Sequence, residues 1–227
     1  MDVKLIDLMK RYIHIVLLFV SMSSAFAETE VNLGGRAGMN IAHIRKMEVQ
    51  NTAKRSVNLG SNFGGILRVN FNKNIGVQTE ILFTQKGQRW KVQKDSAKYF
   101  TRFVNNYIEV PVLAVARFGS DKVKFIGMTG VYMAYWSGAY TQSSTKIEKQ
   151  TYKEDTEDYL FSKQDRRFDM GISTGIGVDF KLGKGWFELL ARHNLGLISR
   201  EKNSSNKTYN CNFNFSIGYL FNLTKHE

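Results

Sequence analysis

Apolar and polar residues alternate with a period of two along this chain, most clearly over residues 168–182, FDMGISTGIGVDFKL. Phe168, Ile172 and Ile176 occupy one phase, whereas Asp169 and Asp179 occupy the other. This pattern predicts a β-strand with one apolar face and one polar face. The stretch is longer than a typical strand of a soluble protein, which has about 5–6 residues. It satisfies the about 9–11 residues that a transmembrane β-strand needs.

The same alternation recurs along the chain and predicts eight strands. Their ranges are 31–44, 61–71, 75–86, 104–118, 122–140, 168–182, 186–197 and 208–221. The fourth strand contains Pro111, the one proline of the chain, which predicts a local bulge or break because proline cannot donate to a sheet ladder. The fifth strand has the weakest alternation, and its two faces are not assigned.

Long and short connections alternate between these strands. The segments 72–74, 119–121 and 183–185 are tight turns, whereas 45–60, 87–98, 141–166 and 199–207 are polar loops. Outer-membrane barrels have short periplasmic turns and longer external loops. We therefore expect an all-β fold, an eight-stranded antiparallel up-and-down transmembrane β-barrel.

The alternation also predicts what each face of the sheet contacts. In lipid the backbone must satisfy its own hydrogen bonds, so the sheet closes and its apolar face points outward. The polar phase then fills a lumen that, with eight strands, is just wide enough for side chains. We expect an interior polar network of Arg36, Arg68, Glu80, Glu109, Asp179, Glu188 and Arg192. Leu113 and Val115 fall in the same phase, and we attribute this departure to a phase shift at Pro111.

The N-terminus has the pattern of a cleaved signal peptide. A basic segment precedes the apolar run 12–20, and Ala25 and Ala27 match the small-x-small rule for cleavage between Ala27 and Glu28. This divides the chain into a signal peptide, 1–27, and an outer-membrane β-barrel domain, 28–227. The alternative is an uncleaved helical anchor. We expect the protein in the outer membrane of the cell, exported through the inner membrane.

The formal net charge of +12 narrows the class of partner. The basic residues are dispersed and form no run interleaved with aromatic residues, so nucleic acid is not expected as a partner. Phosphate-bearing lipid head groups fit the charge better. Cys211, the one cysteine, cannot form an internal disulfide, and we interpret it as a small buried or lipid-facing hydrophobic residue.

The sequence gives little support for a catalytic, metal-binding or cofactor-binding site. No pair of the four histidines has zinc-ligand spacing, and no glycine-rich phosphate loop is present, so we expect no metal and no cofactor. A lipid-modifying enzyme would need a serine, a histidine and an acid on the outer wall or at its rim. His193, Ser199 and Glu188 are the candidates, but the alternation turns Glu188 inward. We therefore expect no catalytic residues.

Several short blocks together resemble the outer-membrane β-barrel family of Bacteroidetes-type bacteria, which includes the PorT-like proteins. The blocks are 34–40 (GGRAGMN), 78–87 (QTEILFTQKG), 107–111 (YIEVP), 175–177 (GIG), 191–196 (ARHNLG) and 218–221 (GYLF). The resemblance implies an eight-stranded barrel in the outer membrane. It also implies a link with protein secretion, with which PorT-like members are associated.

These observations favour a non-enzymatic integral outer-membrane β-barrel that is structural or interacts through its external loops, chiefly 45–60 and 141–166. The expected partners are outer-membrane lipid and lipopolysaccharide, with secretion or envelope proteins as further candidates. Three alternatives remain: a component of a secretion apparatus, a lipid-modifying enzyme, and a soluble barrel with an apolar interior.

Overall fold

The computed structural model describes residues 29–45, 53–56, 58–94, 97–147, 150–202 and 207–224. The expected signal peptide, with its cleavage site between Ala27 and Glu28, lies outside these ranges. No helix in the described part of the chain is long and apolar enough to cross a membrane. The described residues form ten strands: β1 (Glu30–Arg45), β2 (Ala53–Ser56), β3 (Asn58–Asn70), β4 (Ile75–Lys94), β5 (Ala97–Gly119), β6 (Val123–Ile147), β7 (Gln150–Asp158), β8 (Phe168–Leu182), β9 (Gly185–Gly196) and β10 (Tyr209–Asn222).

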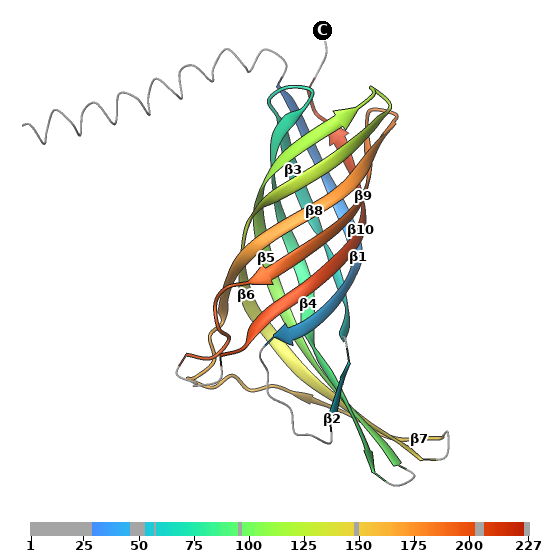
Figure 1. Ribbon diagram of the computed structural model, residues 1–227, viewed down its shortest axis with the longest axis vertical. Helices are drawn as coiled ribbons and strands as arrows, with labels where there is room; N and C mark the ends of the chain where they lie inside the picture. The colour runs from blue at the N-terminus through green and yellow to red at the C-terminus, as the bar shows by residue number, and fades with distance from the viewer. Residues whose placement is uncertain are drawn as a thin grey trace, which may run out of the picture.

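Eight of the ten strands close into a ring. The order is β4-β3-β1-β10-β9-β8-β6-β5, and β5 pairs again with β4. All of these pairings are antiparallel. Figure 1 shows the resulting tilted barrel. The prediction of an all-β, eight-stranded up-and-down barrel is therefore confirmed, and β2 and β7 are additions to it.

The short turns and the two described ends of the chain lie at the same end of the barrel. Asn32 near the start of β1 pairs with Asn222 at the end of β10. In the turn between β3 and β4, the Asn72 Oδ1 atom accepts hydrogen bonds from the amides of Asn74 (2.8 Å) and Ile75 (2.9 Å). This is the local side-chain bonding that makes asparagine favourable in turns. The predicted short turns are thus confirmed at this end.

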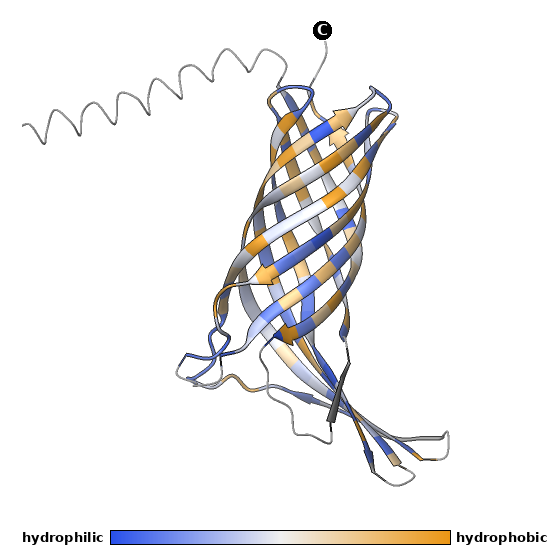
Figure 2. Cartoon of the chain, viewed as in Figure 1, coloured by the Kyte–Doolittle hydropathy of each residue, from blue (hydrophilic) through white to orange (hydrophobic). Residues whose placement is uncertain are grey.

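The outer wall of the barrel is apolar and its interior is mainly polar (Figure 2). Ile176, at the centre of β8, is 72% exposed, whereas Asp179 on the same strand is fully buried. The strand with unassigned faces, β6, places Ile126, Tyr132 and Trp136 inside. This is the reverse of a soluble protein, so the alternative of a soluble barrel with an apolar interior is wrong.

Pro111 does not cause the predicted bulge. The β5–β6 register continues unbroken through the Pro111–Tyr132 pair and shifts instead between Asn106 and Tyr107. Because Pro111 has no N–H, it interrupts the β4–β5 ladder instead. The pairing of β4 with β5 skips Glu80 and Ile81 and then continues in the same register. Of the two predicted irregularities at Pro111, a bulge or a break, the structure has the break, in the β4–β5 ladder.

Leu113 and Val115 point inward without any phase shift. They pack with buried residues of β6 and β9, namely Ile126, Met128 and Leu190. This apolar sector covers part of the lumen wall. The interior therefore combines an apolar sector with charged groups, which the alternation on single strands did not reveal.

Three strands continue far beyond the ring, at the end opposite to the short turns (Figure 1). The polar segments 87–94, 97–98 and 141–147, all within predicted loops, are paired strand in β4, β5 and β6. Strands β7 and β2 pair with the outer parts of these strands. We call this projecting sheet the external arm: β2, β7 and the parts 87–94, 97–106 and 138–147. The loop predictions for 87–98 and parts of 45–60 and 141–166 are wrong. In the arm the outward phase of β4 carries cations such as Lys91, and the inward phase carries aromatic residues such as Trp90, which is the reverse of the pattern on the barrel wall.

The arm leaves the barrel at a level marked by two irregularities. Gly87 of β4 has a φ of +144°, a conformation that favours glycine. At nearly the same level Ser137 is the extra residue of the bulge in β6, and its Oγ donates to the Asn106 carbonyl (3.0 Å). Because bulges bend strands and increase their twist, these residues account for the change of direction at the rim.

Candidate functional site

All seven predicted interior residues lie in the lumen and are at most 5% exposed. The Arg68 guanidinium pairs with Asp179 (2.7 Å) and with Glu188. Arg36 pairs with Glu188 (2.5 Å) and with Glu80 (3.3 Å). Glu80 also pairs with Arg192 (2.9 Å), and Glu109 accepts a hydrogen bond from Asn194 (2.7 Å). The predicted polar residues therefore do come together inside the barrel.

The network also contains charged residues that were not among the predicted set. Lys86 pairs with Glu109 (2.6 Å) and approaches Asp169 (3.7 Å), while Arg117 pairs with Asp179 (3.2 Å) and approaches Glu30 (3.6 Å). A signal for Lys86 was available, because it shares the inward phase of Gln78 and Glu80. Lys86 was not included in the predicted network because it lies at the end of the predicted strand 75–86.

Two of these ion pairs span the lumen from side to side. In the ring order, β3 lies opposite β8 and β4 lies opposite β9. The Arg68–Asp179 and Glu80–Arg192 pairs join these opposite strands. Removing one member of a buried ion pair typically costs about 3–5 kcal/mol, because its partner is left charged and unpaired. The lumen is thus crossed by mutually dependent charges, an arrangement suited to filling space.

Aromatic residues cover the lumen at its external end. The Trp136 ring stacks between the rings of Tyr107 (6.1 Å between centroids) and Tyr159 (5.8 Å). Phe103 and Phe161 meet Trp136 edge-on. We call these five residues the mouth cluster. Just inside it, the Lys86 ammonium lies 5.0 Å from the Tyr107 ring centroid, so the cluster directly adjoins the ionic network.

The segment after β7 folds back to complete the mouth cluster. The Tyr159 amide donates to the Ala139 carbonyl (2.9 Å), and the Trp136 amide donates to the Arg167 carbonyl (2.7 Å). Burial, with the Asp165 carboxylate nearby, raises the pKa of the Tyr159 phenol. The phenol therefore stays protonated and donates to both carboxylate oxygens of Asp165 at 3.2 Å.

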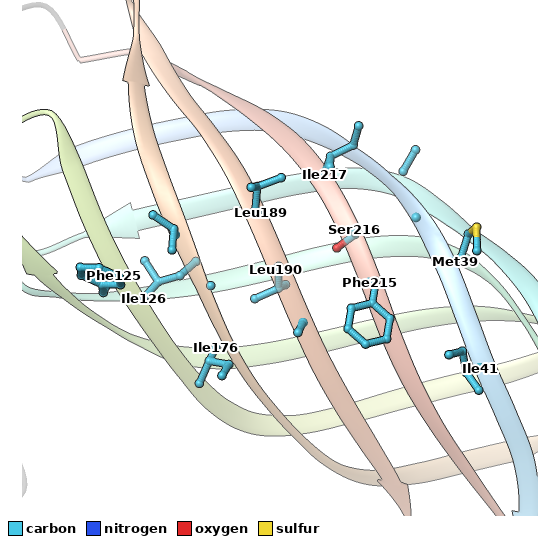
Figure 3. Close-up of a pocket in the computed structure, with 15 residues that line it drawn as sticks. Met39, Ile41, Phe125, Ile126, Ile176, Leu189, Leu190, Phe215, Ser216 and Ile217 are labelled. Carbon is cyan, nitrogen blue, oxygen red and sulfur yellow. The ribbon is translucent and has the colours of Figure 1, made fainter.

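The outer wall has an apolar groove of about 1140 Å³ across β1, β6, β8, β9 and β10. Figure 3 shows Ile176, Leu189 and Phe215 on its walls. Gly38 and Gly177 contribute no side chain, which hollows the surface between these larger residues. The groove belongs to the same apolar face as the exposed aromatic and aliphatic side chains of the barrel.

The candidate residues for lipid modification are not assembled into a triad. His193 lies on the outer wall, where its ring stacks on Phe213 (4.4 Å) and its Nε2 is 3.3 Å from the sulfur of Cys211. Glu188 lies on the other side of the wall, paired with two arginines. Ser199 lies beyond the end of β9, and its Oγ accepts a hydrogen bond from the Glu201 amide (3.4 Å).

Cys211 is buried at the outer wall, as predicted. It is the β10 partner of His43 on β1 and lies beside His193 of β9. Within the described ranges, no group of three or more His, Cys, Asp or Glu side chains could hold a metal ion.

Comparison with known proteins places the chain in a family. Among solved structures, Neisserial surface protein A is similar over 84% of this chain and 96% of its own, with 12% identity and a TM-score of 0.42. OprG from Pseudomonas aeruginosa is similar over 85% of this chain and 95% of its own, with 14% identity and a TM-score of 0.40. No curated relative matches the sequence. The outer membrane protein beta-barrel domain family matches residues 23–202, and this chain, a protein of the outer membrane, belongs to that family.

Proposed function

We propose that this protein is a non-enzymatic, closed outer-membrane barrel that interacts with the phosphate groups of lipopolysaccharide through its external arm. The observation that carries the proposal is a cluster of cations on the outward face of the arm. We call it the basic face: Arg89, Lys91, Lys98, Arg102 and Lys146.

The strand register places the basic face on one side of the sheet. Arg89 is the partner of Arg102, and Lys98 is the partner of Lys146. Cross-strand partners share a face. Along β4, Arg89 and Lys91 keep the phase of Ile81, which is exposed on the barrel wall. The basic face therefore continues the apolar wall of the barrel beyond the rim, at the level where we expect the head groups of the outer leaflet.

Local contacts leave four of these charges available to anions, whereas the Arg102 guanidinium already donates to the Asn58 side chain (2.5 Å) and to the Leu59 carbonyl. None of the five cations forms an ion pair with another residue that the structure describes. Arg89 lies 5.0 Å from the centroid of Phe100, and Lys91 and Lys146 each lie 5.9 Å from it. Arginine binds phosphate through two parallel hydrogen bonds and lysine as a point charge. Each cation near an anionic surface contributes about 1 kcal/mol.

Because the lumen is filled with side chains, the proposed function does not include transport. Ion pairs join opposite strands, and the mouth cluster covers the external end. A wide water path would have to break these pairs, each at a cost of several kcal/mol. Reconstitution in planar bilayers should accordingly give no steady single-channel current at moderate voltage. A persistent open conductance would contradict this part of the proposal.

The interaction can be tested with two matched triple variants. Lys91→Gln/Lys98→Gln/Lys146→Gln removes three charges from the basic face. Lys73→Gln/Lys122→Gln/Lys184→Gln removes three exposed charges at the opposite end of the barrel. Lipopolysaccharide retained per barrel in mild detergent should fall strongly for the first variant, with binding weaker by about 100-fold at about 1 kcal/mol per charge. It should stay unchanged for the second, and equal retention by both would overturn the proposal.

The resemblance to PorT-like proteins keeps a secretion role as an alternative. It makes a different prediction, because deletion of the gene would then change the set of secreted proteins. An unchanged secretome in the deletion strain removes that alternative and leaves the lipopolysaccharide proposal intact. Lipid modification would instead require a change in lipopolysaccharide mass that His193→Ala abolishes.

A further inference from the structure

A cavity of about 340 Å³ lies at the external mouth of the barrel, between the inner face of the arm and the segment after β7. Its lining includes Trp90 of β4, Phe103 of β5, Trp136 of β6 and Tyr159. Its size is within the range of about 300–1,000 Å³ that is typical of small-molecule sites. None of these residues belongs to the basic face, so the cavity is a separate feature of the arm.

The aromatic wall of this cavity is held in place by ring contacts. Tyr159 stacks on Trp136 with an interplanar angle of 14°. Phe103 stands edge-on to Tyr159, with 5.2 Å between ring centroids and an interplanar angle of 79°. These contacts fix the rings before any ligand arrives, which lowers the entropic cost of binding. Both faces of Trp136 are already covered by Tyr107 and Tyr159, so the apolar surface offered to a ligand is that of Trp90 together with the ring edges of the cluster.

Three charged side chains complete the lining. Asp165 and Glu201 are joined by a backbone bridge, and Arg200 comes from the same strand connection as Glu201. The Arg200 guanidinium lies 4.6 Å from the Trp136 ring, and one of its nitrogens donates to Asn105 Oδ1 (3.3 Å). The Glu201 carboxylate forms no hydrogen bond or ion pair with another described residue.

These charges discriminate against charged ligands of either sign. An anion would meet the two carboxylates, Asp165 and Glu201. A cation would be repelled by Arg200, whose guanidinium lies 4.6 Å from the Trp136 ring and 5.6 Å from the Phe103 ring. A neutral ligand with hydroxyl groups meets neither obstacle, because hydroxyls donate to carboxylates and accept from a guanidinium.

We propose that this cavity binds a neutral sugar ring, such as one residue of an external glycan. The apolar C–H face of the ring would lie on the aromatic wall, and its hydroxyls would bond Glu201 and Arg200. Hydrogen bonds to charged groups are stronger than those between neutral groups, so the carboxylate of Glu201 is a main determinant of affinity. This proposal does not depend on binding of phosphate by the basic face.

The test uses the intact barrel in detergent and the neutral methyl glycosides of glucose, galactose, mannose and N-acetylglucosamine. Binding is followed by tryptophan fluorescence and by saturation-transfer NMR. At least one neutral glycoside should bind, and glucuronic acid and glucosamine, which carry opposite charges, should bind at least about tenfold more weakly. No binding of any neutral glycoside at 50 mM, or equal binding of the charged sugars, would overturn the proposal.

Two variants locate the site, and a third serves as the control. Glu201→Gln and Trp90→Ala should each weaken binding by about tenfold or more. Asp158→Asn removes an acid from the outward face of β7 and should leave binding unchanged. The folded state of each variant is verified by the electrophoretic shift of the unheated barrel. Unchanged binding in folded Glu201→Gln and Trp90→Ala would place the sugar elsewhere and contradict the assignment.

A further comparison identifies the source of the sugar. Dephosphorylated core oligosaccharide, released from lipopolysaccharide by removal of lipid A, carries the sugars without the anionic groups. Tighter binding of this oligosaccharide than of the simple glycosides would assign the cavity to lipopolysaccharide sugars. Binding of the simple glycosides alone would assign it to glycans from outside the cell.

Discussion

Strands β4, β5 and β6 each pass through two environments, the wall of the barrel and the external arm, and their side chains differ between the two. In the barrel their outward side chains are apolar, and the inward side chains of β4 and β5 include members of the ionic network such as Glu80 and Glu109. In the external arm the same strands carry cations on the outward face and aromatic residues on the inward face. Backbone pairing is continuous through both parts. The period of two therefore runs through both parts, whereas the face that is apolar changes from the outward one in the barrel to the inward one in the arm.

The largest expected effect comes from comparing two lysines of β4 that lie on opposite sides of the rim. Lys86→Met leaves Glu109 buried without its cation and should destabilise the barrel by about 3–5 kcal/mol. Lys91→Met in the arm should change stability by less than about 0.5 kcal/mol. Urea unfolding in lipid vesicles measures both values.

A compensating change separates loss of the charge pair from loss of packing at Lys86. Lys86→Met/Glu109→Gln removes both charges, so it should be more stable than Lys86→Met alone. If the double variant is the less stable of the two, the pair is not the origin of the effect.

The second comparison places a charge on the outer wall of the barrel and another at the tip of the arm. Ile176→Arg should cost about 2–4 kcal/mol if the residue lies near the bilayer midplane. Ile147→Arg, at the tip of β6 and 40% exposed, should have almost no effect on stability. Normal insertion and stability of Ile176→Arg would contradict the assignment of the outer wall to lipid.

A smaller effect is expected at the level where the arm leaves the barrel. An alanine Cβ at Gly87, where φ is +144°, would lie 2.0 Å from the Phe103 carbonyl oxygen. Gly87→Ala should therefore cost about 1–3 kcal/mol. At Gly138 the nearest atom to an added Cβ is the Asn106 side-chain nitrogen at 3.9 Å, so Gly138→Ala should be tolerated. Equal stability of the two variants would remove Gly87 as a conformational determinant of the rim.

The sequence predicts the barrel well because the barrel has two contrasting faces. The residues Arg36, Glu80 and Asp179 were assigned to the lumen from their phase alone, and they lie there. The same phase would have identified Lys86 and Arg117. The pairings across the lumen, such as Arg68 with Asp179, depend on ring closure and cannot be derived from the alternation of single strands.

The arm and the mouth cavity were not predicted, for different reasons. Polar strands such as β7 carry no periodic signal when water lies on both sides, and they were interpreted as loop. The cavity brings Trp90, Tyr159 and Glu201 together from three distant parts of the chain. No local pattern connects these residues, so the site is visible only in the folded structure.

We infer that the outward face of β4 passes from lipid to water between residues 81 and 89. A fluorophore attached to Ile81→Cys or to Lys91→Cys, in a Cys211→Ala background, tests it directly in vesicles containing lipid-borne quenchers. We predict strong quenching by lipid at residue 81, and quenching only by aqueous iodide at residue 91. Equal quenching by lipid at both positions would show that the arm is embedded in the membrane and would contradict the account.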